Sequence, residues 1–365
     1  MHSLNYKKRF DPLLIILPLL IFFIGLVFLY SASSGIKTIK GIDYTLRQLI
    51  WLTIGLAVVL IVVNIDFRRL VDLSYIFYAL VTIALFIVLM TGGSRMGAKR
   101  WLDIGGFTFQ PSEFAKLALI LGLSFYLGNN RYSIRGFRTF FGAAFITLFL
   151  FILIFKEPDL GSALALFPIL FAVLAAAAVP FKYIFGSVFL GLAASPLFWN
   201  IMKDYQKRRL LVFLNPNMDP LGAGYTVIQS KIAIGSGGLL GKGWMGGTQS
   251  QLNFLPERHT DFIFSVVGEE WGFLGCLLVI LLYTLLLLRI LAVAEKTNDV
   301  YGKLIVAGVA GMLAFQMIVN IAMTAGFMPV VGLPLPFISY GGSSLIMSMA
   351  AIALVINVDM RKTVF

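Results

Sequence analysis

The run LPERHTDFIF, residues 255–264, places polar side chains directly before a strongly apolar segment. Asp261 is the last of them, so its carboxylate is expected at the lipid boundary. Partial desolvation there raises the pKa of an acid toward the range useful to a general base. Arg258 is a candidate contact for a phosphate. Glu257 and His259 are equally well explained as solvated or capping groups.

A second pair of ionisable residues lies in QPSEFAK, residues 110–116. Pro111 and Ser112 before an apolar run are typical of a helix start. Glu113 and Lys116 are three residues apart and therefore share one face of its first turn. An ionisable residue inside a membrane helix is a functional-site hypothesis. The alternative is a mutual ion pair that only holds helices together.

Other polar residues lie where further apolar segments begin or end. Asp159, in KEPDLGS (156–162), is suited to cap the following helix and is also a third acid at the same level. Ser339 lies in the uncharged, proline-rich run 326–344. Such a run can form a re-entrant segment buried in protein, offering hydroxyl and backbone groups to a ligand.

The polar residues that this pattern places on one membrane face have both signs of charge. The cations are Arg100, Lys116, Lys231, Lys242 and Arg258, and the acids are Asp103, Glu113, Asp159, Glu257 and Asp261. Cations that meet a lipid-linked anion, with carboxylates beside them, suggest chemistry or transport on a pyrophosphate lipid.

The glycine-rich run GSGGLLGKGWMGG, residues 235–247, superficially resembles a phosphate-binding loop. A P-loop would need Gly where Ser236 stands and Ser or Thr where Gly243 stands. Two interpretations remain open, a close-packed turn or backbone N–H groups near a phosphate.

Glu269 and Glu270, about two turns into a later apolar run, are expected to pair with interior cations.

The elements that must position these residues are membrane helices. The 365 residues are 59% hydrophobic and only 13% charged, with a mean hydropathy of +0.92, and apolar runs of about 20 residues fit spanning helices. His2, His259 and Cys276 are the only His and Cys residues, which excludes a cage of such ligands. The net charge of +12 comes without a nucleic-acid-reading motif, and anionic membrane lipids explain it equally well.

The expected fold is an all-α polytopic membrane protein with ten transmembrane helices. The apolar segments are 12–30, 46–65, 71–90, 112–128, 139–156, 160–179, 183–199, 262–288, 302–327 and 343–359. About twice as many Lys and Arg residues flank the segments on the N-terminal side as on the other, so both termini are expected to be cytoplasmic. The first segment is expected to be a retained span.

A long extracytoplasmic loop, about 200–261, is expected between the seventh and eighth helices. Residues 203–216 have a basic and an apolar face, like a helix at a membrane interface, and 225–234 show a similar period. The chain contains no obvious linker, so residues 1–365 are expected to form one membrane domain whose outer loop carries Asp261.

Several of these motifs together resemble the SEDS family (shape, elongation, division and sporulation). The matching runs are QPSEFAKL (110–117), KEPDLGSAL (156–164), LPERHTDFIFSVVGEEWG (255–272) with the preceding glycine-rich loop, and GLPLPFISYGGSS (332–344). Their order and spacing agree from about residue 12 to 360. The short N-terminus and the stop directly after the tenth segment resemble the rod-elongation branch more than the division branch.

The resemblance implies a bacterial cytoplasmic-membrane enzyme with an extracytoplasmic active site. Family members are peptidoglycan glycosyltransferases that polymerise lipid II beside a class B penicillin-binding protein. Asp261 matches the essential acid of the large outer loop, and Glu113, Lys116 and Asp159 match residues lining the central cavity.

The linkage inverts from α in lipid II to β-1,4 in the glycan, so one in-line displacement needs a single general base, for which Asp261 is the candidate. Lys116, Arg100, Lys231 and Arg258 are candidates to hold the pyrophosphate. A divalent cation, Mg²⁺ or Mn²⁺, could serve instead, and no organic cofactor is expected. Two other classes stay open, a lipid II flippase and a non-catalytic scaffold for a penicillin-binding protein.

Overall fold

The computed structural model describes residues 10–34, 43–91, 93–95, 98–104, 107–130, 136–220 and 222–362. The chain is mostly helical. Eight of the ten expected apolar segments each fall on one helix, whereas 71–90 covers parts of α3 and α4 and 183–199 covers parts of α8 and α9. The helices are α1 (Leu13–Ser33), α2 (Tyr44–Asn64), α3 (Phe67–Asp72), α4 (Ser74–Thr91), α5 (Pro111–Asn129), α6 (Phe137–Lys156), α7 (Leu160–Ala176), α8 (Phe181–Ala193), α9 (Ser195–Ile201), α10 (Asp204–Leu214), α11 (Ala223–Ser236), α12 (Thr248–Gln251), α13 (Ile263–Lys296), α14 (Val300–Thr324) and α15 (Gly342–Arg361).

Several helices are suited to crossing a membrane. Within the described residues, six are long and apolar enough, and a seventh span results if α8 and α9 are counted together, although they bend by 41° where they meet. Phe145, Phe189 and Leu60 are among the large apolar side chains that remain exposed on such helices, as expected for surfaces in contact with lipid.

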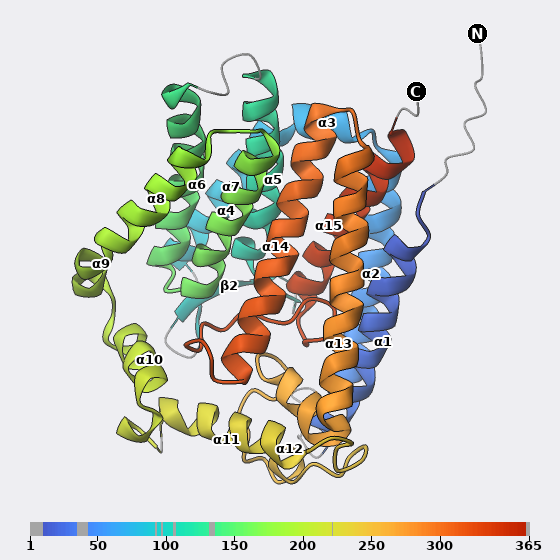
Figure 1. The fold of residues 1–365 in the computed structure, drawn as a ribbon, viewed down its shortest axis with the longest axis vertical. Coiled ribbons are helices and arrows are strands. Elements are labelled where there is room, and N and C mark those ends of the chain that lie inside the picture. Colours follow the sequence, from blue (N-terminus) through green and yellow to red (C-terminus); the bar gives the residue numbers. More distant parts are fainter. Residues whose placement is uncertain are drawn as a thin grey trace.

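The helices form a bundle with two different ends (Figure 1). Helices α11 and α12 lie across one end, here called the α11 end, and α3 lies at the other, the α3 end. The first residues of α1 and the last of α15 meet at the α3 end, where the Asp11 amide donates to Asp359 Oδ2 at 2.8 Å. The chain therefore enters and leaves the bundle at the same end.

Helix α14 lies inside the bundle and contacts α5, α7 and α13, whereas α15 packs mainly on α2. Close packing needs small residues where helix backbones approach. A Cβ on Gly311 of α14 would come within 2.9 Å of the Pro168 carbonyl oxygen of α7. Small residues at such contacts are the usual means by which membrane helices approach one another.

Three short strands precede α5, between the third and fourth expected apolar segments, where the sequence did not predict any strand. Strands β1 (Gly93–Arg95), β2 (Ala98–Ile104) and β3 (Phe107–Phe109) pair antiparallel in the order β1-β2-β3. Contacts of β2 with α4 and α5 fix the ribbon on the bundle. The ribbon thereby positions Arg100 at the start of α5.

Helix α13 is broken at Gly272, whose φ of 63° lies in the left-handed region that favours glycine. The glycine-rich run 237–243 fills the break with four backbone hydrogen bonds: Lys242 N to Glu269 O, Gly243 N to Glu270 O, Phe273 N to Gly238 O, and Leu274 N to Leu239 O. These groups would otherwise lack partners. The run is therefore a close-packed turn that supports the break in α13, as in the first of the two interpretations. The N–H groups of Lys242 and Gly243 donate to helix carbonyls and not to a phosphate.

The two acids beside the break are held in different ways. Glu269 accepts from Lys242 Nζ at 2.9 Å and from the Gln249 amide at 2.9 Å, which confirms the expected pairing with a cation. Glu270 instead accepts a hydrogen bond from the Ser31 hydroxyl of α1. Both acids thus stabilise the contacts of α13 with its neighbours.

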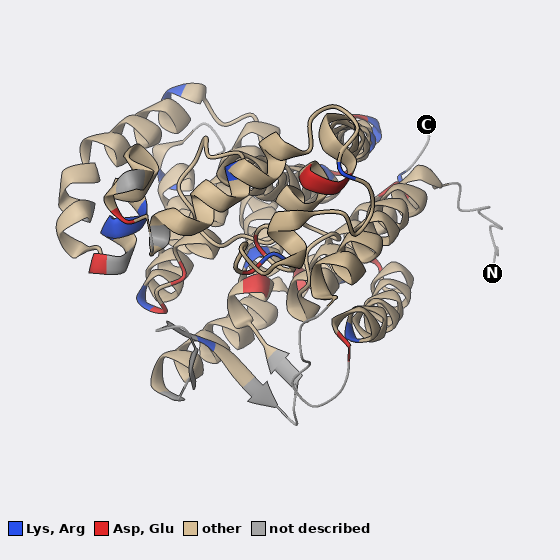
Figure 2. Ribbon diagram, turned by 90° about the horizontal axis from the view of Figure 1, so that it is seen from below, with Lys and Arg blue, Asp and Glu red and all other residues tan. Residues whose placement is uncertain are grey.

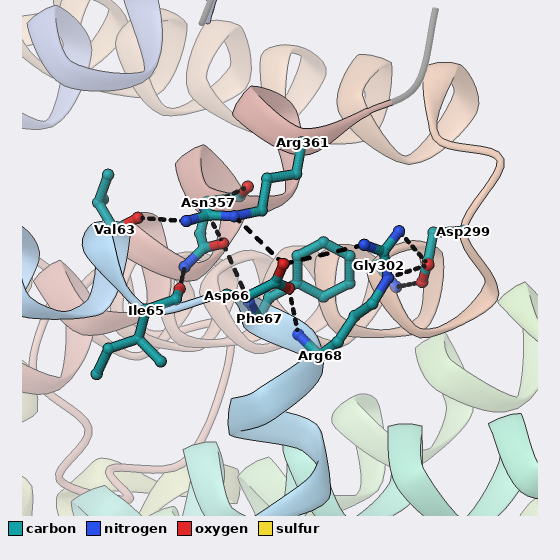
Figure 3. A network of polar contacts seen from close by, with 9 residues as sticks. All are labelled: Val63, Ile65, Asp66, Phe67, Arg68, Asp299, Gly302, Asn357 and Arg361. Atoms are coloured by element: carbon teal, nitrogen blue, oxygen red, sulfur yellow. Dashed lines mark hydrogen bonds and ion pairs between the residues drawn. The ribbon is translucent and has the colours of Figure 1, made fainter. Parts of the chain in front are cut away.

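The α3 end is closed by a polar network (Figure 3). Arg68 pairs with Asp299 at 2.9 Å, and Arg361 lies 3.7 Å from Asp66. The Asn357 amide group donates to carbonyl oxygens at the end of α2, at 2.5 and 2.6 Å. The network joins α2, α3, α14 and α15, and it satisfies carbonyls that the helix end leaves free.

Candidate functional site

The pair Glu113–Lys116 lies in the first turns of α5, as the sequence predicts. Lys116 Nζ lies 2.7 Å from Glu113 Oε1, and both side chains are buried. Glu113 Oε2 is also buried and has no hydrogen-bond partner among the described residues. Glu113 and Lys116 thus form an ion pair through Oε1, and Oε2 can still accept a hydrogen bond from a ligand.

Asp159 begins α7 and gathers donors from three segments. It caps the helix by accepting from the Ser162 amide, which confirms the capping prediction. Its carboxylate also accepts from the Gln110 side chain at 2.9 Å and from the Ser112 hydroxyl at 3.0 Å, and Arg100 Nη1 lies 3.6 Å away. These contacts join the strand ribbon, the start of α5 and the start of α7.

Two loops at the α11 end are bonded to each other, the 255–261 loop and the 325–341 loop. The Ser339 hydroxyl donates to the Thr260 carbonyl at 2.6 Å and accepts from the Leu335 amide at 2.8 Å. The Tyr340 amide donates to the His259 carbonyl at 3.0 Å. Ser339 thus has a positioning contact in this structure, and its predicted part in binding remains a prediction.

Asp261 ends the first of these loops and is held by α14 and by the second loop. Its carbonyl accepts from Asn320 of α14 at 3.0 Å, and the same amide group donates to Leu333 at 2.7 Å. The half-buried carboxylate lies against the 325–341 loop, where a Cβ on Gly332 would come within 3.3 Å of Oδ2. Backbone contacts on both sides therefore fix the position of this acid.

Burial and the nearby Glu257 raise the pKa of Asp261 from 3.8 to about 6. The cations Arg209 and Arg100 act in the opposite direction and Asp159 adds to the rise. These influences show that α10, the strand ribbon and the start of α7 all bring charge near Asp261. A carboxylate with this pKa is ionised at neutral pH and is still basic enough to take a proton.

Glu157 is the most isolated acid of the site. Its side chain is fully buried, and neither carboxylate oxygen has a hydrogen-bond partner among the described residues. Burial, with a contribution from Asp159, raises its pKa to about 9, against the opposing effect of Arg100. Glu157 is therefore neutral at pH 7.

The remaining predicted residues lie further apart. Arg258 is buried and donates from Nε to the Ala32 carbonyl of α1 at 2.5 Å, and burial lowers its pKa. Lys231 is exposed on α11, with its stem against Gly326. The side chain of Asp103 lies outside the described residues. The structure thus brings Arg100, Asp159 and Asp261 together.

Sequence reasoning missed Arg209 and Gln110. Arg209 belongs to the basic face expected for 203–216, but nothing in the sequence indicates that this helix turns toward Asp261. Gln110 precedes the Pro111 helix start, a position at which its long amide can reach Asp159. Seen from the α11 end, some of the charged residues lie near the centre of the bundle and others lie at its edge (Figure 2).

The site contains acids but no ready-made metal cage. No group of three or more His, Cys, Asp or Glu side chains suited to a metal is found among the residues that the structure describes. Two carboxylates, Asp159 and Asp261, influence each other electrostatically. That donor set fits Mg²⁺ only if a phosphate ligand supplies further oxygens.

Comparisons with known proteins agree with one another. A family model described as "Cell cycle protein" (FtsW, RodA, SpoVE) matches residues 11–364. The peptidoglycan glycosyltransferase MrdB of Escherichia coli (strain K12) is 39% identical over 360 residues, covering 98% of this chain and 95% of that protein. The peptidoglycan glycosyltransferase RodA of Treponema pallidum is 35% identical over 428 residues, covering 97% and 98%.

Solved structures show the same fold. One, described as "Structural coordination of polymerization and crosslinking by a peptidoglycan synthase complex", superposes with a TM-score of 0.82 at 38% identity, covering 96% of this chain and 98% of that one. The rod shape determining protein RodA of Thermus thermophilus superposes with a TM-score of 0.72 at 32% identity, covering 97% and 98%.

Proposed function

This chain belongs to the SEDS family of FtsW, RodA and SpoVE proteins, and from this premise we propose that it is a peptidoglycan glycosyltransferase that polymerises lipid II for cell-wall elongation. It is a multi-pass bacterial membrane protein. The observation that carries the proposed chemistry is Asp261, a fixed, half-buried carboxylate of raised pKa beside cations.

The proposed topology has ten spans with both termini in the cytoplasm and one membrane domain over residues 1–365. Helix α1 starts and α15 ends at the α3 end, in agreement with an even number of crossings. The α11 end, with α10, α11 and α12 between the seventh and eighth spans, then faces the extracytoplasmic side. Asp261 would meet its substrate there, at the membrane surface.

In the proposed reaction, the 4-hydroxyl of an acceptor sugar attacks the anomeric carbon of a lipid II donor. The new C–O bond forms as the bond to undecaprenyl pyrophosphate breaks, and the bonding electrons leave on the pyrophosphate oxygen. Asp261 takes the hydroxyl proton. One displacement inverts α to β, so a single base is sufficient. A base of pKa about 6 is ionised at neutral pH and accepts this proton.

The cations of the site would stabilise the leaving pyrophosphate, whose charge grows as the bond breaks. Arg100 lies by Asp159, and Arg209 and Arg100 both act on Asp261. Lys116 is paired to Glu113 by one oxygen only. Arg258 and Lys231 remain proposed contacts for other parts of the lipid.

A divalent cation, Mg²⁺ or Mn²⁺, is proposed to assist, held by Asp159 together with the substrate phosphates, so that Asp261 stays available as the base. When bound, it would neutralise charge on the pyrophosphate. The proposed partner is a class B penicillin-binding protein, which would crosslink the strands. Support comes from the solved relative, described as a synthase complex that coordinates polymerization and crosslinking.

The test is incubation of the purified protein with labelled lipid II, with and without the partner, followed by electrophoresis of glycan strands. Polymer from the wild type and none from Asp261→Asn is expected, with equal thermal unfolding of both. A moenomycin-resistant product excludes contaminating soluble-domain glycosyltransferases. Movement of lipid II across vesicles without polymer would favour a flippase, and neither activity would favour a scaffold; both outcomes would contradict the proposal.

A further inference from the structure

Four aromatic side chains meet beside the loop pair that carries Asp261. They are Tyr44 and Trp51 of α2, His259 of the 255–261 loop and Tyr340 of the 325–341 loop, here called the aromatic platform. The Tyr44 ring centre lies 4.8 Å from that of His259 and 5.0 Å from that of Tyr340. All four side chains are half-buried.

Polar contacts join the segments that carry the platform. Gln48, one turn after Tyr44, donates to the Ser339 carbonyl at 3.2 Å and accepts from the Gly341 amide at 3.3 Å. The Tyr340 hydroxyl accepts hydrogen bonds from the side chains of Arg47 and Trp51. Helix α2 and both loops are therefore joined to one another by hydrogen bonds.

Asp261 lies in one of these loops. It follows His259 by two residues, so their Cα atoms are separated by at most about 7 Å. The Tyr340 amide and the Ser339 hydroxyl bond to the carbonyls of His259 and Thr260. If Asp261 is the base, the platform is within reach of a strand longer than one disaccharide.

An aromatic belt of a membrane protein is the alternative explanation. Belt residues are Trp and Tyr side chains placed at the headgroup level of the bilayer. Here the rings come from three separate segments and contact one another in edge-on or tilted pairs, and the Tyr340 hydroxyl is bonded to Arg47. The Nδ1 atom of His259 is buried without a hydrogen-bond partner among the described residues. Such a mixture of ring faces and convergent polar groups is typical of a ligand site.

We propose that the aromatic platform binds sugar rings of the glycan strand next to the reaction centre. A β-linked pyranose presents a face of axial C–H bonds, whose slightly positive hydrogens pack against the negative face of an aromatic ring. Its hydroxyls lie at the ring edge, where the His259 imidazole can bond them. This inference rests on the proposed function, because it assigns a second part of the same substrate.

A platform of this kind would retain the strand between successive additions. Loss of one stacking ring weakens binding by about two- to tenfold. The strand would then dissociate more often, so the mean glycan length would fall by a similar factor. The first coupling joins two lipid II molecules before any longer strand exists, so its rate should not change.

The test compares Tyr44→Leu, which keeps apolar bulk but removes the ring, with Tyr44→Phe, which keeps the ring. Purified variants polymerise labelled lipid II, and both the first coupling rate and strand length are measured. Tyr44→Leu should shorten strands about two- to tenfold at an unchanged first rate, and Tyr44→Phe should restore wild-type length. Phe254→Leu is the matched control, since Phe254 is exposed in the same loop region and makes no ring contact among the described residues.

Binding is measured separately in the Asp261→Asn background, with a soluble tetrasaccharide of alternating GlcNAc and MurNAc. Addition of Tyr44→Leu should weaken that binding about two- to tenfold. Equal strand lengths and equal binding for Leu and Phe would overturn the platform, as would a parallel loss of first rate and thermal stability, which would indicate a structural role. A wild-type protein that makes no polymer would instead refute the proposed function.

Discussion

The two ends of the bundle use charged residues in different ways. At the α3 end the ionisable groups of Figure 3 complement one another: Arg68 with Asp299, and Arg361 with Asp66. At the α11 end, charge is buried and left incompletely paired. The ionisable side chains with a buried, unpartnered nitrogen or oxygen among the described residues are Arg100, Glu113, Glu157, Arg258, His259 and Glu270.

The difference has an energetic meaning. Paired charges near a surface contribute little, about 0–1 kcal/mol each. A buried polar group without a partner costs about 1–3 kcal/mol. A fold accepts such a cost where a ligand supplies the missing partner. The comparison therefore supports the proposal that the reaction takes place at the α11 end, whereas the α3 end is a structural closure.

The largest expected effect comes from breaking the buried Glu113–Lys116 pair. Lys116→Met leaves the Glu113 carboxylate buried without its cation, which should reduce the free energy of unfolding by about 3–5 kcal/mol. Thermal unfolding in detergent, read by intrinsic fluorescence, measures the loss.

The double variant Glu113→Gln/Lys116→Met is the control for this prediction. It removes both charges at similar volume, so most of the stability should return while polymer synthesis stays low. Recovery of both stability and activity would mean that this pair only holds helices together, as at the α3 end.

The pH dependence of activity comes next in size. Because Asp261 has a raised pKa of about 6, kcat/KM should fall about tenfold for each pH unit below 6 and level off above it. The folded protein binds this proton more tightly than the unfolded chain, since the unfolded pKa is near 3.8. The charged form therefore costs stability as pH rises from 4 through 6, and acidification does not remove stability through this group.

Unfolding and inactivation can thus be separated. If the protein keeps its thermal midpoint at pH 5 while its activity has dropped, the titration belongs to the site. An activity that stays flat from pH 7 to 5 would contradict the assignment of Asp261 as base.

The smallest effect is expected for Glu157→Gln. Glu157 is buried with a pKa of about 9, so at pH 7 it is already neutral and the amide is close to isosteric. Activity and unfolding temperature at pH 7 should match the wild type, with a difference appearing only above pH 9. A large loss at pH 7 would show that this carboxyl is charged in the working enzyme.

Much of this arrangement could be predicted from the sequence. The ten apolar segments fall on helices because long apolar runs leave the backbone no other partner in a bilayer. The caps and pairs that act over a few residues, at Asp159 and at Glu113–Lys116, were also predictable. The amphipathic runs 203–216 and 225–234 fall on α10 and α11.

Features that depend on distant contacts could not be read in this way. The break in α13 exists because the run 237–243 supplies hydrogen-bond partners to it, and a 34-residue apolar helix gives little sign of that. The strands before α5 are too short to show a clear alternation. Arg209 reaches the site only because α10 turns toward it, and the isolation of Glu157 follows from burial by segments remote in sequence.

The most direct test of the proposal that the α11 end carries the reaction compares the loss of one carboxylate at each end of the bundle. Asp261→Ala and Asp299→Ala each remove a carboxylate that precedes a helix, the first at the α11 end and the second as the cap of α14 and partner of Arg68. Initial rates of lipid II polymerisation and thermal midpoints are measured for both.

Asp261→Ala should lose about 10²–10⁴-fold in rate without loss of stability. Asp299→Ala should lose about 0.5–2 kcal/mol of stability and keep its rate. An active Asp261→Ala, or a stable but inactive Asp299→Ala, would contradict the account.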